Sequence, residues 1–303
     1  MIKNFLNYIS IAFKGICMGA ADVIPGVSGG TIAFLMGIYQ ELINSIKSIV
    51  PNLKLLFHGN FSEFWRAING NFLLSLLIGI LISIFSLARV MTFLLHNYPI
   101  QVWSFFFGLI LASSVYILKG LDKWNLQNIL SLLFGVFVAS YICLVSPSET
   151  PNEYWFVFLS GAIAICAMIL PGISGSFILL LLGKYKFIMD AIAELNIPVI
   201  IVFACGAILG ILAFSHFLSW LLKRYYMMTI ALLSGFMIGS LIKVWPWKIS
   251  LPEGIDYPTL PSQYFNEYNI NPQLSSAIIF ALIGIVSVFA IEFFAQKKEK
   301  QTN

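Results

Sequence analysis

A short polar motif interrupts two long apolar stretches of this sequence. Pro25 to Gly30 reads PGVSGG, and Pro171 to Ser176 reads PGISGS. Proline removes an amide donor and glycine relaxes the backbone, so each Pro-Gly pair is expected to end a helix. The serine that follows stands where it can cap the next helix. Because a helix N-terminus with free N–H groups favours an anion, the motif predicts a site for a phosphate or a carboxylate.

The residue types within the motif divide into two predicted roles. Pro25, Gly26, Pro171 and Gly172 are predicted to break the helices. Ser28 and Ser174 are predicted to cap the helices that follow, and Gly29 and Gly30 to leave their amides open to a ligand. Within lipid, the backbone groups freed by a break must be satisfied by protein, water or ligand, so two such breaks indicate a bound group. The alternative is that the glycines only let helices pack closely.

Two basic side chains lie inside apolar stretches. Arg89 stands in SIFSLARVMTFLL, and its guanidinium suits bidentate recognition of phosphate. An arginine in a membrane helix marks a functional site by default, but Arg89 could also reach the outer interface near Asn97. His216 stands in LAFSHFLSW; it is either a satisfied interior group or a titrating group that couples transport to protons.

Two acids are candidates for coupling. Asp22 precedes the first break by three residues and is predicted to be a partner of Arg89, a proton or cation site, or a structural cap. Glu41 follows Gly37-Ile38-Tyr39-Gln40 and is either a coupling residue or a solvated one at the membrane face.

Composition sets the class of protein. The chain has 303 residues, 59% of them hydrophobic and only 10% charged, which indicates an all-α polytopic membrane protein. The formal charge of +4 is better explained by membrane topology than by nucleic-acid binding. The cysteines and histidines form no metal-ligand pattern, so we expect no metal, no cofactor and no catalytic residue. The apolar pattern predicts two broken or re-entrant helical hairpins at 11–46 and 155–195, and transmembrane helices at 72–95, 100–118, 128–146, 199–222, 226–245 and 275–295.

The sequence is internally duplicated. Residues 15–39 align with 161–185, where ten of 25 positions are identical, and beyond the hairpin Gly79 aligns with Gly206 and Arg89 with His216. The first repeat is residues 1–150 and the second is 151–303. Each repeat has a hairpin plus three crossings, so the number of crossings is odd and the second copy is inverted. Lysine and arginine in the loops place both termini in the cytoplasm.

The motifs resemble those of a known family. The strings GAADVIPGVSGGTIAFLMGIYQELI at 19–43 and LPGISGSFILLLLGKY at 170–185 are similar to those of the bacterial polyprenyl-phosphate (undecaprenyl phosphate) translocase family, and the resemblance covers nearly the whole chain. It implies a transporter in the bacterial cytoplasmic membrane that returns undecaprenyl phosphate from the outer to the inner leaflet, where this carrier of cell-wall precursors is reused. It adds Thr31, Gly175 and Ser176 to the expected phosphate-binding residues, while the acid that often follows Gly-x-Tyr is Gln40 here.

Other functions stay open at this point. A secondary transporter or channel for a small soluble anion would use the same broken helices, and only the resemblance favours a lipid. A membrane enzyme such as a lipid phosphatase would need a nucleophile set or an acidic metal cluster, and the sequence suggests neither. A purely structural role in the membrane would not explain why the sequence breaks two helices in the same way. The coupling ion and the oligomeric state do not follow from the sequence.

Overall fold

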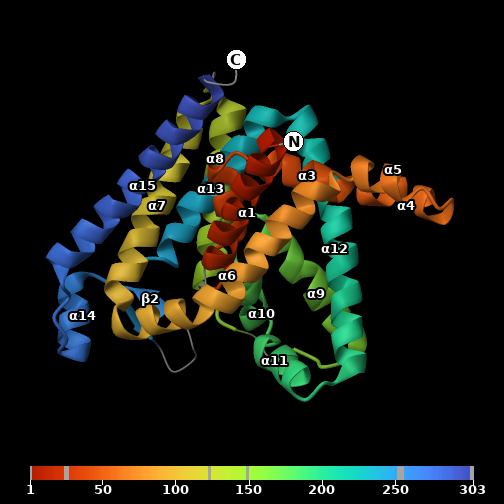
Figure 1. Cartoon of the computed structure of the whole chain (residues 1–303). Helices are drawn as coiled ribbons and strands as arrows, with labels where there is room; N and C mark the ends of the chain where they lie inside the picture. Colours follow the sequence, from red (N-terminus) through yellow and green to blue (C-terminus); the bar gives the residue numbers. More distant parts are fainter. Residues whose placement is uncertain (1, 24–26, 122–123, 148–149, 251–255, 301–303) are drawn as a thin grey trace. The chain divides into compact units, whose positions relative to one another are not determined.

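The computed structural model describes the backbone of residues 2–23, 27–121, 124–147, 150–250 and 256–300. Most of these residues are helical, and the sheet is one two-stranded antiparallel ribbon (Figure 1). The helices of the first half are α1 (Ile2–Asp22), α2 (Gly29–Leu35), α3 (Tyr39–Lys47), α4 (Ile49–Phe57), α5 (Phe61–Ala67), α6 (Gly70–Asn97), α7 (Pro99–Lys119) and α8 (Leu126–Leu144). The second half contains α9 (Tyr154–Ile169), α10 (Gly175–Leu181), α11 (Tyr185–Ala193), α12 (Ile197–Arg224), α13 (Tyr226–Gly239), the 3-10 helix η1 (Ser240–Ile242), β1 (Lys248–Ser250), β2 (Asp256–Pro258), α14 (Pro261–Tyr268) and α15 (Leu274–Lys300).

Several helices have the length and the composition of membrane spans. Within the described part of the chain, four meet both criteria: Gly70–Leu87 in α6, Pro99–Lys119, Leu126–Leu144 and Ile197–Arg224. Three shorter apolar helices cover Tyr154–Ile169, Tyr226–Ile242 and Leu274–Ala290. Large apolar side chains such as Ile201, Ile208 and Phe217 of α12 are exposed, as expected for side chains that face lipid. The prediction of an all-α polytopic membrane protein is therefore confirmed.

The predicted segment boundaries need three corrections. The first arm of the first hairpin begins at Ile2 rather than at residue 11, so α1 has 21 residues. The segment predicted as a helix over 226–245 is helical only to Gly239, because a 3-10 turn and then Pro246 end it. The stretches treated as loops carry structure of their own: α4 and α5 lie within 48–71, and the β-ribbon and α14 lie within 246–274.

The second arm of each predicted hairpin is itself interrupted. Between α2 and α3 the chain turns at Gly37, whose φ is +69°, and between α10 and α11 it turns at Gly183, whose φ is +62°. The N–H of Ile38 bonds back to the Ala33 carbonyl at 3.0 Å, and the N–H of Lys184 bonds to the Leu179 carbonyl at 2.8 Å. Both turns are glycine C-caps of the Schellman type, which need a left-handed residue that glycine adopts without strain.

Two compact units make up the chain, and each draws on both sequence halves. One unit contains residues 1–89 and 147–226, and the other contains residues 90–146 and 227–303. Helix α6 continues from the first unit into the second. Each unit thus holds one segment from each of the two predicted repeats.

Two helix crossings in the first unit lie at positions that the predicted repeat aligns. Helix α1 packs on α6 where a side chain at Gly15 would collide with the Leu76 carbonyl oxygen. Helix α9 packs on α12 in the same way, because a side chain at Gly161 would collide with the Phe203 carbonyl oxygen. Since residues 15 and 161 are equivalent in the repeat, the two halves make the same close helix crossing. The small-residue contacts typical of membrane helices therefore lie at matching places.

The second unit is built around a long helix pair. Helix α7 runs alongside α15 over most of their lengths (Figure 1), and η1 packs against both α7 and α8. The β-ribbon lies at one end of this unit, where Trp247 packs with Ile100 and Ala277.

Candidate functional site

The first break is closed by a serine cap. Ser28 has an extended backbone and precedes α2, and its hydroxyl accepts a hydrogen bond from the Gly30 N–H at 3.0 Å. The Thr31 N–H bonds to the Ser28 carbonyl at 3.0 Å. This is the N-cap that the sequence predicted, since Ser supplies an acceptor for the amides that a helix start leaves open. Pro25 and Gly26 lie outside the described residues.

Asp22 occupies the position where an anion was expected. Its Oδ1 accepts a hydrogen bond from the Gly29 N–H at 2.6 Å, and a side chain at Gly29 would collide with this carboxylate. The charge stabilises the start of α2, as carboxylates do at helix N-termini. In this conformation the amides of Gly29, Gly30 and Thr31 each have a partner from the chain itself.

The two breaks contact each other directly. The Ser28 hydroxyl donates toward the carbonyl oxygens of Met168 at 3.0 Å and Leu170 at 3.3 Å, in residues about 140 positions away along the chain. In return, the Gly172 N–H donates to the Thr31 hydroxyl oxygen at 2.8 Å. Ser28, Thr31 and Gly172 are buried, so these bonds lie inside the protein. The backbone groups freed by one break are therefore satisfied partly by the other.

The second break is similar but carries no acid. Helix α9 ends at Ile169 and α10 begins at Gly175, so the helix is interrupted across Pro171 and Gly172, whose φ is +87°. The Ser174 and Ser176 hydroxyls share a hydrogen bond of 2.8 Å. The side chain nearest to Gly175 is that of Met168, which the repeat aligns with Asp22. Among the described residues, neither hydroxyl of this break forms a hydrogen bond to a carboxylate.

The remaining predicted site residues lie apart from these contacts. Arg89 is exposed on α6, on a face that also exposes Phe85 and Phe93, and the structure records no bond between Arg89 and Asp22 among the described residues. His216 is half-buried, with its Nδ1 2.8 Å from the Leu212 carbonyl oxygen one turn earlier. Glu41 is exposed and accepts a hydrogen bond from the Asn69 amide at 2.8 Å.

Sequence reasoning missed the role of Lys184. This residue is not among the predicted site residues, yet its side chain is only 1% exposed. Its Nζ donates to the Thr150 carbonyl and to the Asn152 side-chain oxygen, both at 2.6 Å, and it lies 5.6 Å from the centre of the Phe156 ring. A signal was present, because the repeat aligns Lys184 with the apolar Ile38, which is also buried. Lys184 fixes the segment before α9 to the turn after α10.

Removing this lysine is expected to loosen the turn. The Lys184→Met variant keeps the apolar stem but leaves the Thr150 carbonyl and the Asn152 side chain without the ammonium, and each hydrogen bond to a charged group contributes about 2 kcal/mol. The melting temperature of the purified protein in detergent should fall by several degrees. The matched control is Lys186→Met, since Lys186 is exposed in the same segment. Equal melting temperatures for the two variants would contradict this role.

The site offers hydroxyls, backbone amides and one carboxylate. Among the residues that the structure describes, no group of three or more His, Cys, Asp or Glu side chains is arranged to hold a metal ion.

Interrupted helices that meet inside a bundle of apolar spans are typical of membrane transporters. A family model described as undecaprenyl phosphate translocase-like matches residues 18–257, and the chain belongs to this family. A polyprenyl-phosphate transporter from Vibrio cholerae serotype O1 is 43% identical over 308 aligned positions, covering 98% of this chain and all of the relative. A polyprenyl-phosphate transporter from Staphylococcus aureus is 33% identical, over 78% of this chain and 89% of the relative. No solved structure matches the chain. The family and its members are named as transporters, in agreement with the expectation that the chain is not an enzyme.

Proposed function

We propose that this protein transports a polyprenyl phosphate across the bacterial cytoplasmic membrane, and that undecaprenyl phosphate moves from the outer to the inner leaflet for reuse. The relatives named as polyprenyl-phosphate transporters support this substrate class. The observation that supports the proposal most is the contact between the two breaks. It brings hydroxyl, amide and carbonyl groups together inside a membrane protein. Interrupted helices whose polar groups meet inside the membrane region are where many transporters bind their substrates.

The transporter is an inverted repeat with both termini in the cytoplasm. The matching glycine crossings of α1 with α6 and α9 with α12 support a duplication of the whole packing unit. An odd number of crossings in each half turns the second copy over in the bilayer. The two breaks then approach from opposite leaflets, and a substrate between them is reached from either side in turn.

The phosphate binds next to the two breaks, with Ser174 and Ser176 and the nearby amides as its first donors. The second break suits an anion better than the first in the described conformation, because Met168 rather than a carboxylate lies against Gly175. Ser28, Gly29, Gly30 and Thr31 join when the contact between the breaks opens. The isoprenoid tail stays in the bilayer throughout, since its transfer into a polar cavity would be unfavourable.

Asp22 couples this binding to protons. Its carboxylate holds the Gly29 N–H at the start of α2, and a phosphate there would meet like charge. Uptake of a proton by Asp22 removes this repulsion and weakens its bond to the amide, so the phosphate can take its place. His216 and Glu41 already have partners outside the breaks, and so Asp22 is the stronger coupling residue of the three.

Arg89 receives the lipid phosphate from the bilayer. The side chain is exposed among apolar neighbours on α6, where a lipid has access to it. The Arg89→Gln variant should fold normally, because Arg89 is exposed, and its transport should fall about tenfold, the loss of one charge-assisted contact of roughly 1.5 kcal/mol. The Arg89→Lys variant should retain part of the activity, because the charge remains while the planar fork is lost.

Translocation of labelled polyprenyl phosphate into the inner leaflet of sealed liposomes tests the Arg89 variants. Variants that match the unmodified protein in rate would remove Arg89 from the pathway. The same assay tests the substrate class, because excess soluble phosphate should not compete with the lipid. Strong competition by soluble phosphate would favour a transporter for a small anion.

A further inference from the structure

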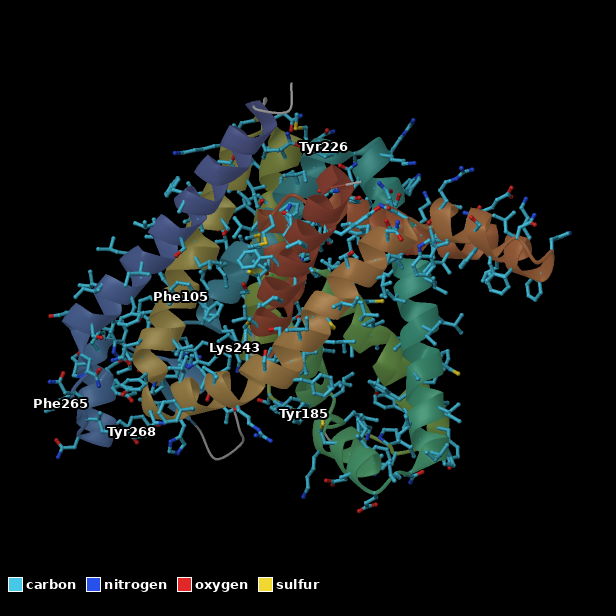
Figure 2. All side chains as sticks on the ribbon, viewed as in Figure 1. Phe105, Tyr185, Tyr226, Lys243, Phe265 and Tyr268 are labelled. Atoms are coloured by element: carbon cyan, nitrogen blue, oxygen red, sulfur yellow. The ribbon has the colours of Figure 1, made fainter. Side chains whose placement is uncertain are left out.

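Helices α4 and α5 form a short hairpin that has no counterpart in the second half of the chain. They lie between α3 and α6, whereas residues 194–196 alone separate α11 from α12, which the predicted repeat aligns with α3 and α6. Neither helix contains a buried residue. The hairpin extends away from α3 and runs across the direction of α12 (Figure 1), and its side chains stand clear of the other helices of this unit (Figure 2). Burial inside the protein therefore does not explain the apolar residues of the hairpin.

Each helix of the hairpin exposes an apolar face. In α4, Val50, Leu53 and Phe57 have the i, i+3, i+7 spacing that places side chains on one face, and all three are exposed. In α5, Phe61 and Trp65 lie one turn apart and are also exposed. Helices of nine and seven residues are too short to cross a bilayer, which takes about 20 residues. These apolar faces can therefore meet lipid only near the membrane surface.

The two ends of the hairpin are fixed to the ends of membrane spans. Before α4, the Lys47 ammonium of α3 donates a hydrogen bond of 3.2 Å to the Ser219 hydroxyl, which lies near the end of α12. After α4, the Trp65 indole N–H of α5 donates one of 2.8 Å to the side-chain oxygen of Asn71, at the start of α6. Both α6 and α12 contain candidate membrane spans. A hairpin held where two spans end lies at the level of the lipid head groups, where tryptophan is also enriched.

The hairpin carries a surplus of basic side chains. Residues 47–69 contain three lysine or arginine residues and one acid, Glu63. Lys54 and Arg66 are exposed, and among the described residues neither forms an ion pair with a carboxylate. Lys54 lies one turn after Val50, so its aliphatic stem can follow the apolar face while its ammonium reaches the phosphates. Basic groups beside an apolar face are typical of helices that bind an anionic membrane surface.

We propose that α4 and α5 form a membrane anchor that lies in the surface of the leaflet where α6 begins and binds anionic phospholipids. The exposed apolar side chains enter the boundary between head groups and acyl chains, and Lys54 and Arg66 contact the phosphates. A second copy of this chain is a poorer partner, because a symmetric contact would bring two equally basic patches together. The anchor is present whether or not the two breaks carry a polyprenyl phosphate.

The depth of a label at position 57 tests the anchor. The purified full-length protein, with its four native cysteines replaced by alanine, receives Phe57→Cys and a spin label and is placed in nanodiscs. Phe57 is 87% exposed, so the substitution should leave the fold intact. Oxygen dissolves in lipid, and a charged nickel complex stays in water. The label should collide more with oxygen than with nickel, at a depth of about 5–10 Å below the head groups.

The matched control is a label on the polar side of the same hairpin. Glu63 is exposed and lies two residues after Phe61, so it points to the opposite face of α5. A spin label on Glu63→Cys should therefore collide more with the nickel complex than with oxygen. Equal melting temperatures of the two labelled proteins would show that both report the same fold.

The charge of the lipid tests the basic groups. Adding phosphatidylglycerol to phosphatidylcholine nanodiscs should raise the ratio of immersed to solvent-exposed label at position 57, and high salt should reverse this rise. Lys54→Gln should lower the ratio about fivefold in the anionic lipid, the effect of one basic group at such a surface, and should leave it unchanged in the neutral lipid. Lys186→Gln removes an exposed lysine elsewhere in the unit and should have no effect.

Three results would overturn the proposal. A label at position 57 that collides more with nickel than with oxygen in both lipids would place the hairpin in water. Spin–spin broadening between labels at position 57 would place a second copy of the chain on the apolar face. An immersed label whose response to phosphatidylglycerol is the same in Lys54→Gln as in Lys186→Gln would remove the anionic lipid from the site.

Discussion

Replacing Gly30 with alanine is expected to reduce polyprenyl phosphate translocation about tenfold or more. A Cβ at this position would lie 2.5 Å from the Ile169 carbonyl oxygen, which is backbone and has little freedom to move. The two breaks would have to separate, with loss of the bonds from Ser28 to Met168 and from Gly172 to Thr31. Overpacking and two lost hydrogen bonds together cost about 2–5 kcal/mol.

The comparison variant is Gly120→Ala. Gly120 is exposed at the end of α7, and a Cβ there would come no closer than 3.3 Å to the carbonyl of its own helix. Both variants add one methyl group, so a difference between them reports the contact between the breaks. Translocation rates and melting temperatures are measured for both in the same lipid. A Gly30→Ala protein with the activity and the stability of Gly120→Ala would show that the contact has no role.

Replacing Asp22 with asparagine is expected to preserve the fold and to abolish proton coupling. The side-chain oxygen of asparagine can still accept the Gly29 N–H, so the melting temperature should change little. A neutral amide cannot take up or release a proton, so translocation should fall about tenfold, and the residual rate should no longer respond to a pH gradient.

The Asp22→Met variant separates the cap from the charge. Methionine is the residue at the equivalent position of the second break, Met168. The substitution leaves the Gly29 N–H without its acceptor, which costs about 1–3 kcal/mol. We therefore expect Asp22→Met to be less stable than Asp22→Asn, with neither responding to a pH gradient. An Asp22→Asn protein with an unchanged rate and an unchanged pH response would exclude Asp22 as the coupling residue.

The sequence predicted the parts of this structure that depend on local chemistry. The Pro-Gly pairs and the serines after them define the breaks, because proline and the N-cap act within a few residues. The apolar runs define the spans, because length and composition alone decide whether a helix suits a bilayer. The duplication is predicted from the sequence, and Gly15 and Gly161, which it aligns, both lie where a side chain would collide with a neighbouring helix.

The missed features depend on contacts between distant parts of the chain. The turns at Gly37 and Gly183 were hidden inside apolar runs, where a glycine is also compatible with a continuous helix. Asp22 was compatible with several partners, and only the folded chain brings it to the Gly29 amide. The sequence could not predict whether Arg89 is buried or exposed. Helix α6 is apolar around most of its circumference, so it has no distinct apolar face that would mark the buried side.

Movement of labelled polyprenyl phosphate between the leaflets of sealed liposomes tests the central claim most directly. The purified protein is compared with its Gly30→Ala variant and with protein-free liposomes, with and without a pH gradient. Transport through the paired breaks predicts movement that requires the protein, responds to the gradient and is nearly lost in Gly30→Ala. A folded and oriented protein that leaves the lipid in its original leaflet would contradict this function.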